Sequence, residues 1–328
     1  MKRMLSIVIA LSAACSSSKG AGPNGTNPDA AGGNGADGNN GNGNHDAPAG
    51  SSQRTIYTIV MENHDYKEIV GSSNAPYINS LISMGALATN YKDTSHPSLP
   101  NYLHMISGDN QYPGIIDIGP NQVPYFPAAK DNLGTQLEAA HINWRSYQES
   151  MGTPCSLSDV PAPPAAAIYA TKHDPFIYFT DMQASALCAQ RNVDFSAFTA
   201  DLNSNAYRYM WITPNLTDDG HDPANDPVSA LTVSDTWLSH HVPDILNSAG
   251  YKAGGVLFIT WDESEGRNGD DPDQIPMIIL SPKLKQVGMT SATAYTHSSY
   301  LATIEDLLGL PRLATVTNTT AMMEFMNP

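Results

Sequence analysis

The stretch YTIVMENHDY, residues 57–66, turns abruptly from apolar to polar. Its first half is a short run of aromatic and aliphatic side chains, which is typical of a strand buried in a sheet. Glu62, Asn63, His64 and Asp65 follow at once. In open α/β sheets, ligands bind outside the carboxyl ends of the strands. The stretch therefore predicts a central strand whose end forms one wall of a site, although a single such end also fits an ordinary turn.

Further apolar runs and helical patterns alternate along the chain. Together with residues 56–61, the runs 209–212, 256–261 and 275–280 read as buried strands. The segments with helical spacing are 76–84, 99–106, 133–140, 233–248 and 300–308. This alternation predicts an α/β fold, a three-layer sandwich with a mostly parallel central sheet.

Three predicted strands end in the same kind of residue. Asp262 and Glu263 follow the run 256–261, and Asn215, Asp218, Asp219, His221 and Asp222 follow the run at 209. The oxygen ligands Glu62, Asn63, Asp262 and Glu263 would converge at one edge of a parallel sheet, where like charges are costly unless a cation neutralises them. We therefore predict one divalent metal ion. The ligands suit Ca, Mg or Mn, and Zn stays open because His221 and His297 could add nitrogen ligands.

The stretch HPSLPNYLHMISGD, residues 96–109, begins a predicted helix at Ser98. Serine is a favoured N-cap, so Ser98 could simply cap this helix. A hydroxyl at a helix N-terminus also lies where backbone N–H groups and the helix dipole favour an anion. Beside a divalent metal it could act as a nucleophile toward phosphorus. The helix start alone does not decide between these two interpretations.

The first 53 residues differ in composition from the rest. Residues 1–15 combine Lys2 and Arg3 with a short apolar run, which predicts a signal peptide too short to span a membrane. Its end, LSAAC, resembles a lipoprotein box with Cys15 as the lipidated residue, and an ordinary signal peptide is the alternative. Residues 16–53 are rich in Gly and Asn and predict a flexible linker. Residues 54–328 then form one catalytic domain, exported in either case.

Cysteine content and net charge limit the environment and the partners. Cys155 and Cys188 remain after the signal region, and an isolated pair in an exported protein favours a disulfide. The net charge of -16 argues against a nucleic-acid partner, which needs a basic surface. It also implies that local groups, and not the field of the whole protein, would hold an anionic substrate.

Seven short motifs occur in a characteristic order between residues 55 and 310. They are Glu62-Asn63-His64, His96-Pro97-Ser98-Leu99-Pro100-Asn101-Tyr102, Trp144-Arg145-Ser146-Tyr147-Gln148-Glu149, Lys172-His173-Asp174-Pro175, Thr213-Pro214-Asn215-Leu216, Gly220-His221-Asp222 and Trp261-Asp262-Glu263. In this order the sequence resembles the bacterial phosphoesterase family that contains acid phosphatases and phospholipases C, within the alkaline-phosphatase-like superfamily.

The resemblance implies a role for each matching position. The metal ligands would be Glu62, Asn63, Ser98, Asp262 and Glu263. Ser98 would be the nucleophile and form a phosphoseryl intermediate. Asn101, His173, His221 and His297 would contact the phosphate or protonate the leaving group. His221 and Asp222 could instead match ligands of a second metal, but Thr217 stands where two-metal relatives carry an aspartate, which favours a single ion.

The resemblance favours an exported, metal-dependent phosphomonoesterase of the acid-phosphatase type. The alternative is a phospholipase C or another phosphodiesterase, so the substrate is a small phosphate ester or a phospholipid, and contact with a membrane would come only through an N-terminal lipid anchor. A sulfatase would need arginine where Tyr102 stands. A surface lipoprotein without catalysis would be expected to lack the nucleophile or the ligands, and all are present.

Overall fold

The computed structural model describes residues 54–111, 116–122, 127–128, 130–161, 168–221, 227–265 and 273–327. The signal peptide and linker predicted for residues 1–53 lie outside them. The strands are β1 (Ile56–Met61), β2 (Ala86–Lys92), β3 (Trp144–Gln148), β4 (Asn192–Asp194), β5 (Tyr209–Thr213), β6 (Val256–Trp261), β7 (Gln274–Leu280), β8 (Met289–Ser291) and β9 (Tyr295–Thr296).

The α-helices are α1 (Tyr66–Ile69), α2 (Pro76–Met84), α3 (Ser98–Ser107), α4 (Leu133–Ala139), α5 (Thr180–Gln183), α6 (Cys188–Arg191), α7 (Phe198–Ser204), α8 (Pro227–Asn247), α9 (Ala249–Lys252) and α10 (His297–Leu308). The short 3-10 helices are η2 (Thr171–His173), η3 (Pro175–Tyr178), η4 (Phe195–Ala197), η6 (Ala314–Val316) and η7 (Met323–Phe325).

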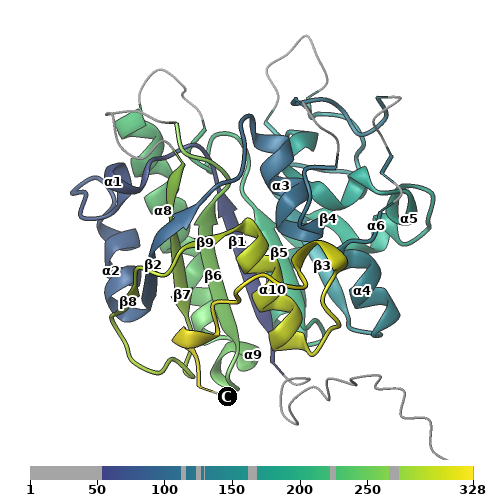
Figure 1. Cartoon of the computed structure of the whole chain (residues 1–328). Coiled ribbons are helices and arrows are strands. Elements are labelled where there is room, and N and C mark those ends of the chain that lie inside the picture. Colours follow the sequence, from purple (N-terminus) through teal and green to yellow (C-terminus); the bar gives the residue numbers. More distant parts are fainter. Residues whose placement is uncertain are drawn as a thin grey trace, which may run out of the picture. The chain divides into compact units, whose positions relative to one another are not determined.

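The strands form one central sheet in the order β4-β3-β5-β1-β6-β7-β2-β8, with β9 paired to β2. All neighbouring strands run parallel except β7, which is antiparallel to both β6 and β2. Helices cover the two faces: α3, α4 and α10 lie on one face, and α2 and α8 on the other (Figure 1). The predicted three-layer α/β sandwich with a mostly parallel sheet is confirmed.

β1 lies in the middle of this sheet, and apart from Thr58 its residues are aliphatic or aromatic. All six of its residues are buried, and β5 and β6 pair with it on either side. Each large apolar side chain buried in this way stabilises the fold by about 1.5–3 kcal/mol. Thr58 is the polar exception, and its hydroxyl forms a 2.6 Å hydrogen bond with that of Tyr300 on α10. This hydrogen bond ties the third residue of the strand to α10 and so helps to fix the position of the strand.

The predicted strands 56–61 and 256–261 and the predicted helix 76–84 have the observed bounds. The helix predicted over 233–248 begins earlier, at Pro227. β2 and β3 were not predicted as strands, because polar residues interrupt their apolar pattern. In β3 the polar residues Ser146 and Gln148 are nevertheless buried, and Gln148 donates a 2.9 Å hydrogen bond to Ser146 within the strand.

Cys155 and Cys188 form a disulfide, as predicted. The bond ties the loop after β3 to α6, at the edge of the sheet where β4 is only three residues long. A covalent link of this kind stabilises mainly by restricting the unfolded chain. Among the helices that the structure describes, none combines the length and hydrophobicity that a membrane span requires.

Candidate active site

The carboxyl ends of β1, β5 and β6 meet at one edge of the sheet. Asp262 donates its backbone N–H to the carbonyl of Met61 at 3.0 Å, and Glu62 donates its own to the carbonyl of Asp219 at 2.9 Å. Glu62 and Asn63 therefore lie between Asp219 on one side and Asp262 on the other. The predicted convergence of the strand ends follows directly from the parallel pairing of these three strands.

The carboxylates brought together here are almost completely buried. Glu62 and Asp262 have no exposed surface, and Glu263 is 5% exposed. Burial raises the pKa of Asp262 well above its ordinary value, and the neighbouring carboxylates of Glu62 and Glu263 raise it further. Burial is also the main reason that the pKa of Glu263 is raised. Three buried acids at one point are therefore electrostatically costly for the chain itself.

Two of the buried oxygens at this point, Asn63 Oδ1 and Asp262 Oδ2, accept no hydrogen bond within the described part of the chain. A third, Glu62 Oε1, is in contact only with His173 Nε2, without hydrogen-bond alignment. Asn63 has a left-handed backbone (φ 38°), which asparagine tolerates better than most residues. Buried oxygens without donors, together with surplus negative charge, are what an oxygen-preferring divalent cation needs. The residues present therefore fit the predicted metal ion.

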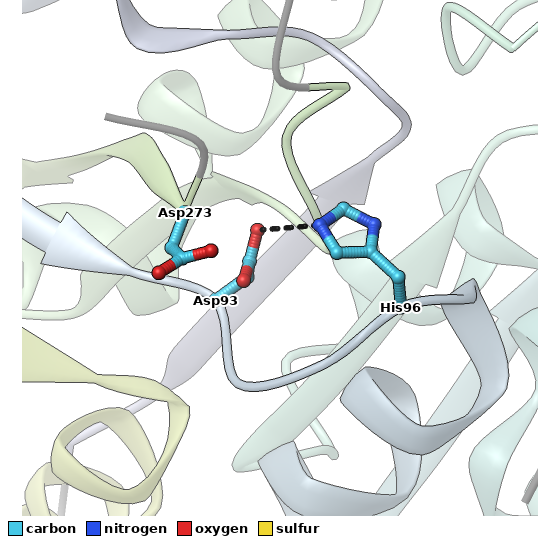
Figure 2. Close-up of side chains that lie close together, drawn as sticks. All are labelled: Asp93, His96 and Asp273. Atoms are coloured by element: carbon cyan, nitrogen blue, oxygen red, sulfur yellow. Dashed lines mark ion pairs between the residues drawn. The ribbon is translucent and has the colours of Figure 1, made fainter. Parts of the chain in front are cut away.

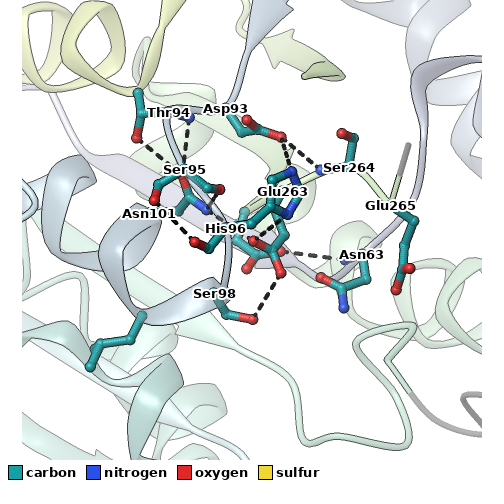
Figure 3. Close-up of polar contacts among 12 residues, drawn as sticks. Asn63, Asp93, Thr94, Ser95, His96, Ser98, Asn101, Glu263, Ser264 and Glu265 are labelled. Atoms are coloured by element: carbon teal, nitrogen blue, oxygen red, sulfur yellow. Dashed lines mark hydrogen bonds and ion pairs between the residues drawn. The ribbon is translucent and has the colours of Figure 1, made fainter. Parts of the chain in front are cut away.

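Ser98 lies against this cluster. Its Oγ is 3.3 Å from Glu263 Oε1 and 3.5 Å from Glu62 Oε2, and Figure 3 shows it beside Glu263. The N-cap of α3 is Pro97, so Ser98 is the first helical residue and makes no capping hydrogen bond. The ordinary capping role that the sequence allowed is therefore wrong, because the hydroxyl faces the carboxylates and not the helix backbone.

A lysine and an aspartate that sequence reasoning missed lie on the other side of Ser98. Lys172 Nζ is 3.4 Å from Ser98 Oγ and 2.9 Å from Asp117 Oδ2. The other oxygen of Asp117 accepts the backbone N–H of Leu99, in the first turn of α3, at 3.0 Å. Burial opposes the charge on Lys172, but the carboxylates of Glu62 and Asp117 outweigh it and raise the pKa of the lysine. The Lys172 ammonium and the Leu99 N–H thus hold the carboxylate of Asp117 next to the Ser98 hydroxyl.

His173 is placed by an acid and an aromatic ring. Its Nε2 lies 2.7 Å from Glu62 Oε1, without hydrogen-bond alignment, so the contact is ionic. Its Nδ1 lies 3.5 Å from Asp219, and its ring stacks on Tyr102 at 4.9 Å. Burial opposes protonation, but Glu62 and Asp219 outweigh it and raise the pKa of His173 to about 9. His221 lies next to it, with 6.3 Å between the ring centroids. Asp222 lies outside the described residues.

Asn101 and His297 support the cluster from behind. Asn101 donates to Glu263 Oε2 at 3.2 Å and to the carbonyl of Ser95 at 2.6 Å, while its oxygen accepts two hydrogen bonds from Thr94. His297 is fully buried, with Nε2 2.7 Å from the carbonyl of Asp262 and Nδ1 2.9 Å from the hydroxyl of Tyr91. Burial lowers the pKa of His297 to about 3. Asn101 thus binds the carboxylate of Glu263, and His297 binds the backbone carbonyl of Asp262.

Residues 51–311 match the sequence model of the Phosphoesterase family. The chain belongs to this family. Similar proteins include acid phosphatases, and the chain is a hydrolase that acts on phosphoric ester bonds.

Similar proteins come from bacteria and fungi. This phosphoesterase is 29% identical over 268 residues to a phosphatidylinositol-3-phosphatase of Mycobacterium tuberculosis, covering 80% of this chain and 79% of that protein. It is 27% identical over 261 residues to a phosphate-repressible acid phosphatase of Penicillium chrysogenum, covering 78% of this chain but 59% of the fungal protein. The phosphoesterase thus spans less than two thirds of that fungal relative.

Solved structures support the fold. A protein of the alkaline phosphatase superfamily from Vibrio parahaemolyticus superimposes with a TM-score of 0.54 and 10% identity, covering 81% of this chain and 69% of that one. The lipoteichoic acid synthase LtaP of Listeria monocytogenes gives 0.58 and 9%, covering 84% and 77%. The fold of the phosphoesterase is therefore alkaline-phosphatase-like.

A cavity of about 450 Å³ lies beside Lys172 and Asp117. Its lining mixes the apolar side chains of Leu157, Ala170 and Leu216 with polar groups that include Asp159. Lys172, which lines this cavity, also contacts Ser98 Oγ. The cavity therefore lies one side chain away from the serine hydroxyl.

Proposed function

We propose that this protein is an exported, metal-dependent phosphomonoesterase of the acid-phosphatase type that acts through a phosphoseryl intermediate at Ser98. The observation that carries the proposal is the position of Asp117. Its carboxylate is bound by the Lys172 ammonium and the Leu99 N–H, next to a serine hydroxyl that caps no helix. A phosphoryl group needs the same donors at the same distance from the nucleophile, so Asp117 stands where substrate oxygens would bind.

In the first step Ser98 Oγ gives up its proton to water and bonds to phosphorus, while the bond from phosphorus to the ester oxygen breaks in line and that oxygen, protonated by His173 or His221, leaves as the alcohol. In the second step a water molecule loses a proton and attacks the phosphoserine from the vacated side, which breaks the bond from phosphorus to Oγ, releases inorganic phosphate and restores the serine hydroxyl. Lys172 and the Leu99 N–H stabilise charge on the non-bridging oxygens. His173 and His221 line the site as further donors to the phosphoryl oxygens or to the leaving group.

Glu62, Asn63, Ser98, Asp262 and Glu263 would hold one divalent cation, whose charge would favour the deprotonated serine and offset charge on the phosphoryl group. Asn101 positions Glu263, and His297 positions Asp262 through its backbone carbonyl. The role of Asn101 and His297 is therefore to hold the ligands in place, because neither side chain has a free nitrogen or oxygen directed at a substrate.

Export is supported by two independent features. The Cys155–Cys188 disulfide suits an oxidising compartment. Residues 1–15 have the composition of a signal peptide, with Cys15 as the residue that a lipid anchor would modify. The substrate class that follows is a small phosphate monoester, including the phosphorylated head group of a lipid, since the Mycobacterium relative is named for such a substrate.

Lys172→Ala is expected to lower catalytic efficiency, whereas Asp117→Ala is expected to strengthen the binding of inorganic phosphate. Without Lys172 the phosphoryl group loses a charged donor, and kcat/KM should fall about 10²-fold. Without Asp117 the competing carboxylate is gone, and the inhibition constant for inorganic phosphate should fall several-fold. Steady-state kinetics on p-nitrophenyl phosphate with added phosphate measures both effects.

Lys130→Ala is the matched control for the lysine. Lys130 also forms a 2.9 Å ion pair with an aspartate, Asp109, which is not a residue of the site. Its removal should leave kcat/KM unchanged. An Asp117→Ala enzyme that binds phosphate more weakly than the wild type would show that Asp117 helps to bind the substrate and does not mimic it.

A substrate panel tests monoester against diester hydrolysis. The purified protein is expected to cleave p-nitrophenyl phosphate at least about 10²-fold faster, in kcat/KM, than bis-p-nitrophenyl phosphate or phosphatidylcholine. The reason is that a monoester presents one more charged oxygen than a diester to the donors Lys172 and the Leu99 N–H. Preferential cleavage of either diester would replace the phosphatase proposal by a phosphodiesterase of the phospholipase C type on the same scaffold.

A further inference from the structure

Asp93, His96 and Asp273 form a second group of metal-ligating side chains, separate from the cluster that faces Ser98. Lys92 of β2 pairs with Gln274 of β7, so Asp93 and Asp273 lie opposite each other at the ends of two antiparallel strands. The backbone N–H of Asp93 donates to the carbonyl of Asp273 at 2.9 Å. One ligand atom from each of the three side chains lies within 4.8 Å of the others. Figure 2 shows Asp93 between the other two residues.

Asp93 is a buried acid with spare acceptor capacity. It is 6% exposed, and its Oδ2 accepts the backbone N–H of Ser264 at 2.8 Å. No donor from the described residues reaches its other oxygen, and His96 Nε2 lies 3.9 Å from Oδ2, beyond hydrogen-bond distance. A buried carboxylate that faces a second carboxylate attracts positive charge.

His96 is oriented for such a cation by its other nitrogen. Its Nδ1 lies 3.0 Å from Glu263 Oε2, while Nε2 is directed at Asp93. When Nδ1–H donates to a carboxylate, the lone pair of the neutral ring is on Nε2, which is the arrangement that carboxylates impose on metal-binding histidines. The side chain of His96 is 48% exposed, so a cation could reach the site from solvent.

We propose that Asp93, His96 and Asp273 bind a second divalent cation, Zn²⁺ or Mn²⁺. One imidazole and two carboxylates suit these ions better than Ca²⁺, which prefers oxygen ligands alone. With Nε2 bound to this cation, His96 holds Glu263 through Nδ1. The binding part of the proposal stands on these three residues, whereas the effect on Glu263 rests on the proposed function, in which Glu263 is a ligand of the catalytic cation.

The number of bound ions tests the proposal. Metal-free protein is dialysed against Zn²⁺ or Mn²⁺, and the bound metal is measured by elemental analysis. We expect two ions per chain for the wild type and one for Asp273→Asn. Asp244→Asn removes an exposed acid on α8 and should retain two ions. Asp262→Asn should also retain one ion, but at the site of Asp93 and not at the site of Ser98.

The outcomes for the two variants test the two metal sites separately. If the wild type and Asp273→Asn bind the same number of ions, the second site is wrong, whatever the activity. If Asp262→Asn loses no ion, the catalytic site is wrong and the site of Asp93 stands. A crystal of the wild type soaked in Zn²⁺ decides the matter even if a variant fails to fold. Anomalous density between Asp93, His96 and Asp273 is expected, and density only beside Ser98 would overturn the proposal.

Discussion

Ser98→Ala is expected to reduce kcat/KM for p-nitrophenyl phosphate by at least about 10³-fold. The hydroxyl is the group that lies between the carboxylates of Glu62 and Glu263 and the Lys172 ammonium. It makes no capping hydrogen bond to α3, so its removal should not weaken the helix. A large loss of activity with an unchanged unfolding temperature would therefore indicate a chemical role.

Ser95→Ala is the matched control, because Ser95 lies in the loop just before α3 and its hydroxyl, among the described residues, hydrogen-bonds only the carbonyl of His96, at 3.4 Å. Its activity should remain near that of the wild type. Acid quenching during turnover, followed by intact-protein mass spectrometry, should find a phosphorylated chain in the wild type and none in Ser98→Ala. Full turnover by Ser98→Ala on every substrate cleaved would show that another group is the nucleophile.

The sequence predicted the central part of this site because strand polarity decides it. An apolar strand that ends in acids places those acids at the carboxyl edge of a parallel sheet, and two such strands lie next to each other if their pairing is parallel. Glu62 and Asp262 follow β1 and β6, which pair in register up to Met61 and Trp261. No side-chain geometry was needed for that part.

The residues contributed by loops could not be predicted in the same way. Asp117 lies in the connection between α3 and α4, where neither periodicity nor strand register gives a position. Lys172 stands next to His173 in a recognisable motif, but only the folded η2 turns its ammonium toward Ser98. Loop conformation depends on tertiary packing, and a sequence pattern records packing only for regular elements.

His297 shows the opposite case, in which a pattern points to the right place but not to the right contact. Its position before the last long helix placed it near the site. The structure adds that both ring nitrogens are engaged, one by the carbonyl of Asp262 and one by Tyr91. The group close to Asp93 follows from the antiparallel pairing of β7 with β2, and β2 itself was not predicted. Long-range antiparallel pairing therefore explains why the sequence did not reveal this second group.

Asp262→Asn is expected to abolish activity and yet to stabilise the metal-free protein. Asp262 is fully buried beside Glu62 and Glu263, and burial and these two carboxylates raise its pKa. Replacing it by a neutral amide removes that repulsion, so the unfolding temperature in EDTA should rise by a few degrees, at about 2–4 °C for each kcal/mol. In the wild type, EDTA should lower the activity at least about 10²-fold.

Divalent cation should reverse the order of stability. A cation at 100 times its dissociation constant stabilises the wild type by about 2.7 kcal/mol, whereas Asp262→Asn lacks a ligand and should gain little. Differential scanning fluorimetry with EDTA and with Mn²⁺ or Zn²⁺ measures both shifts. Glu305→Gln is the control: Glu305 is also a buried acid with a raised pKa, but it binds Gln136 and the Leu313 N–H, away from the cluster. Its response to cation should equal that of the wild type. An Asp262→Asn protein that is less stable than the wild type in EDTA would mean that the three acids are held by contacts within the chain, and the metal site would then lose its physical basis.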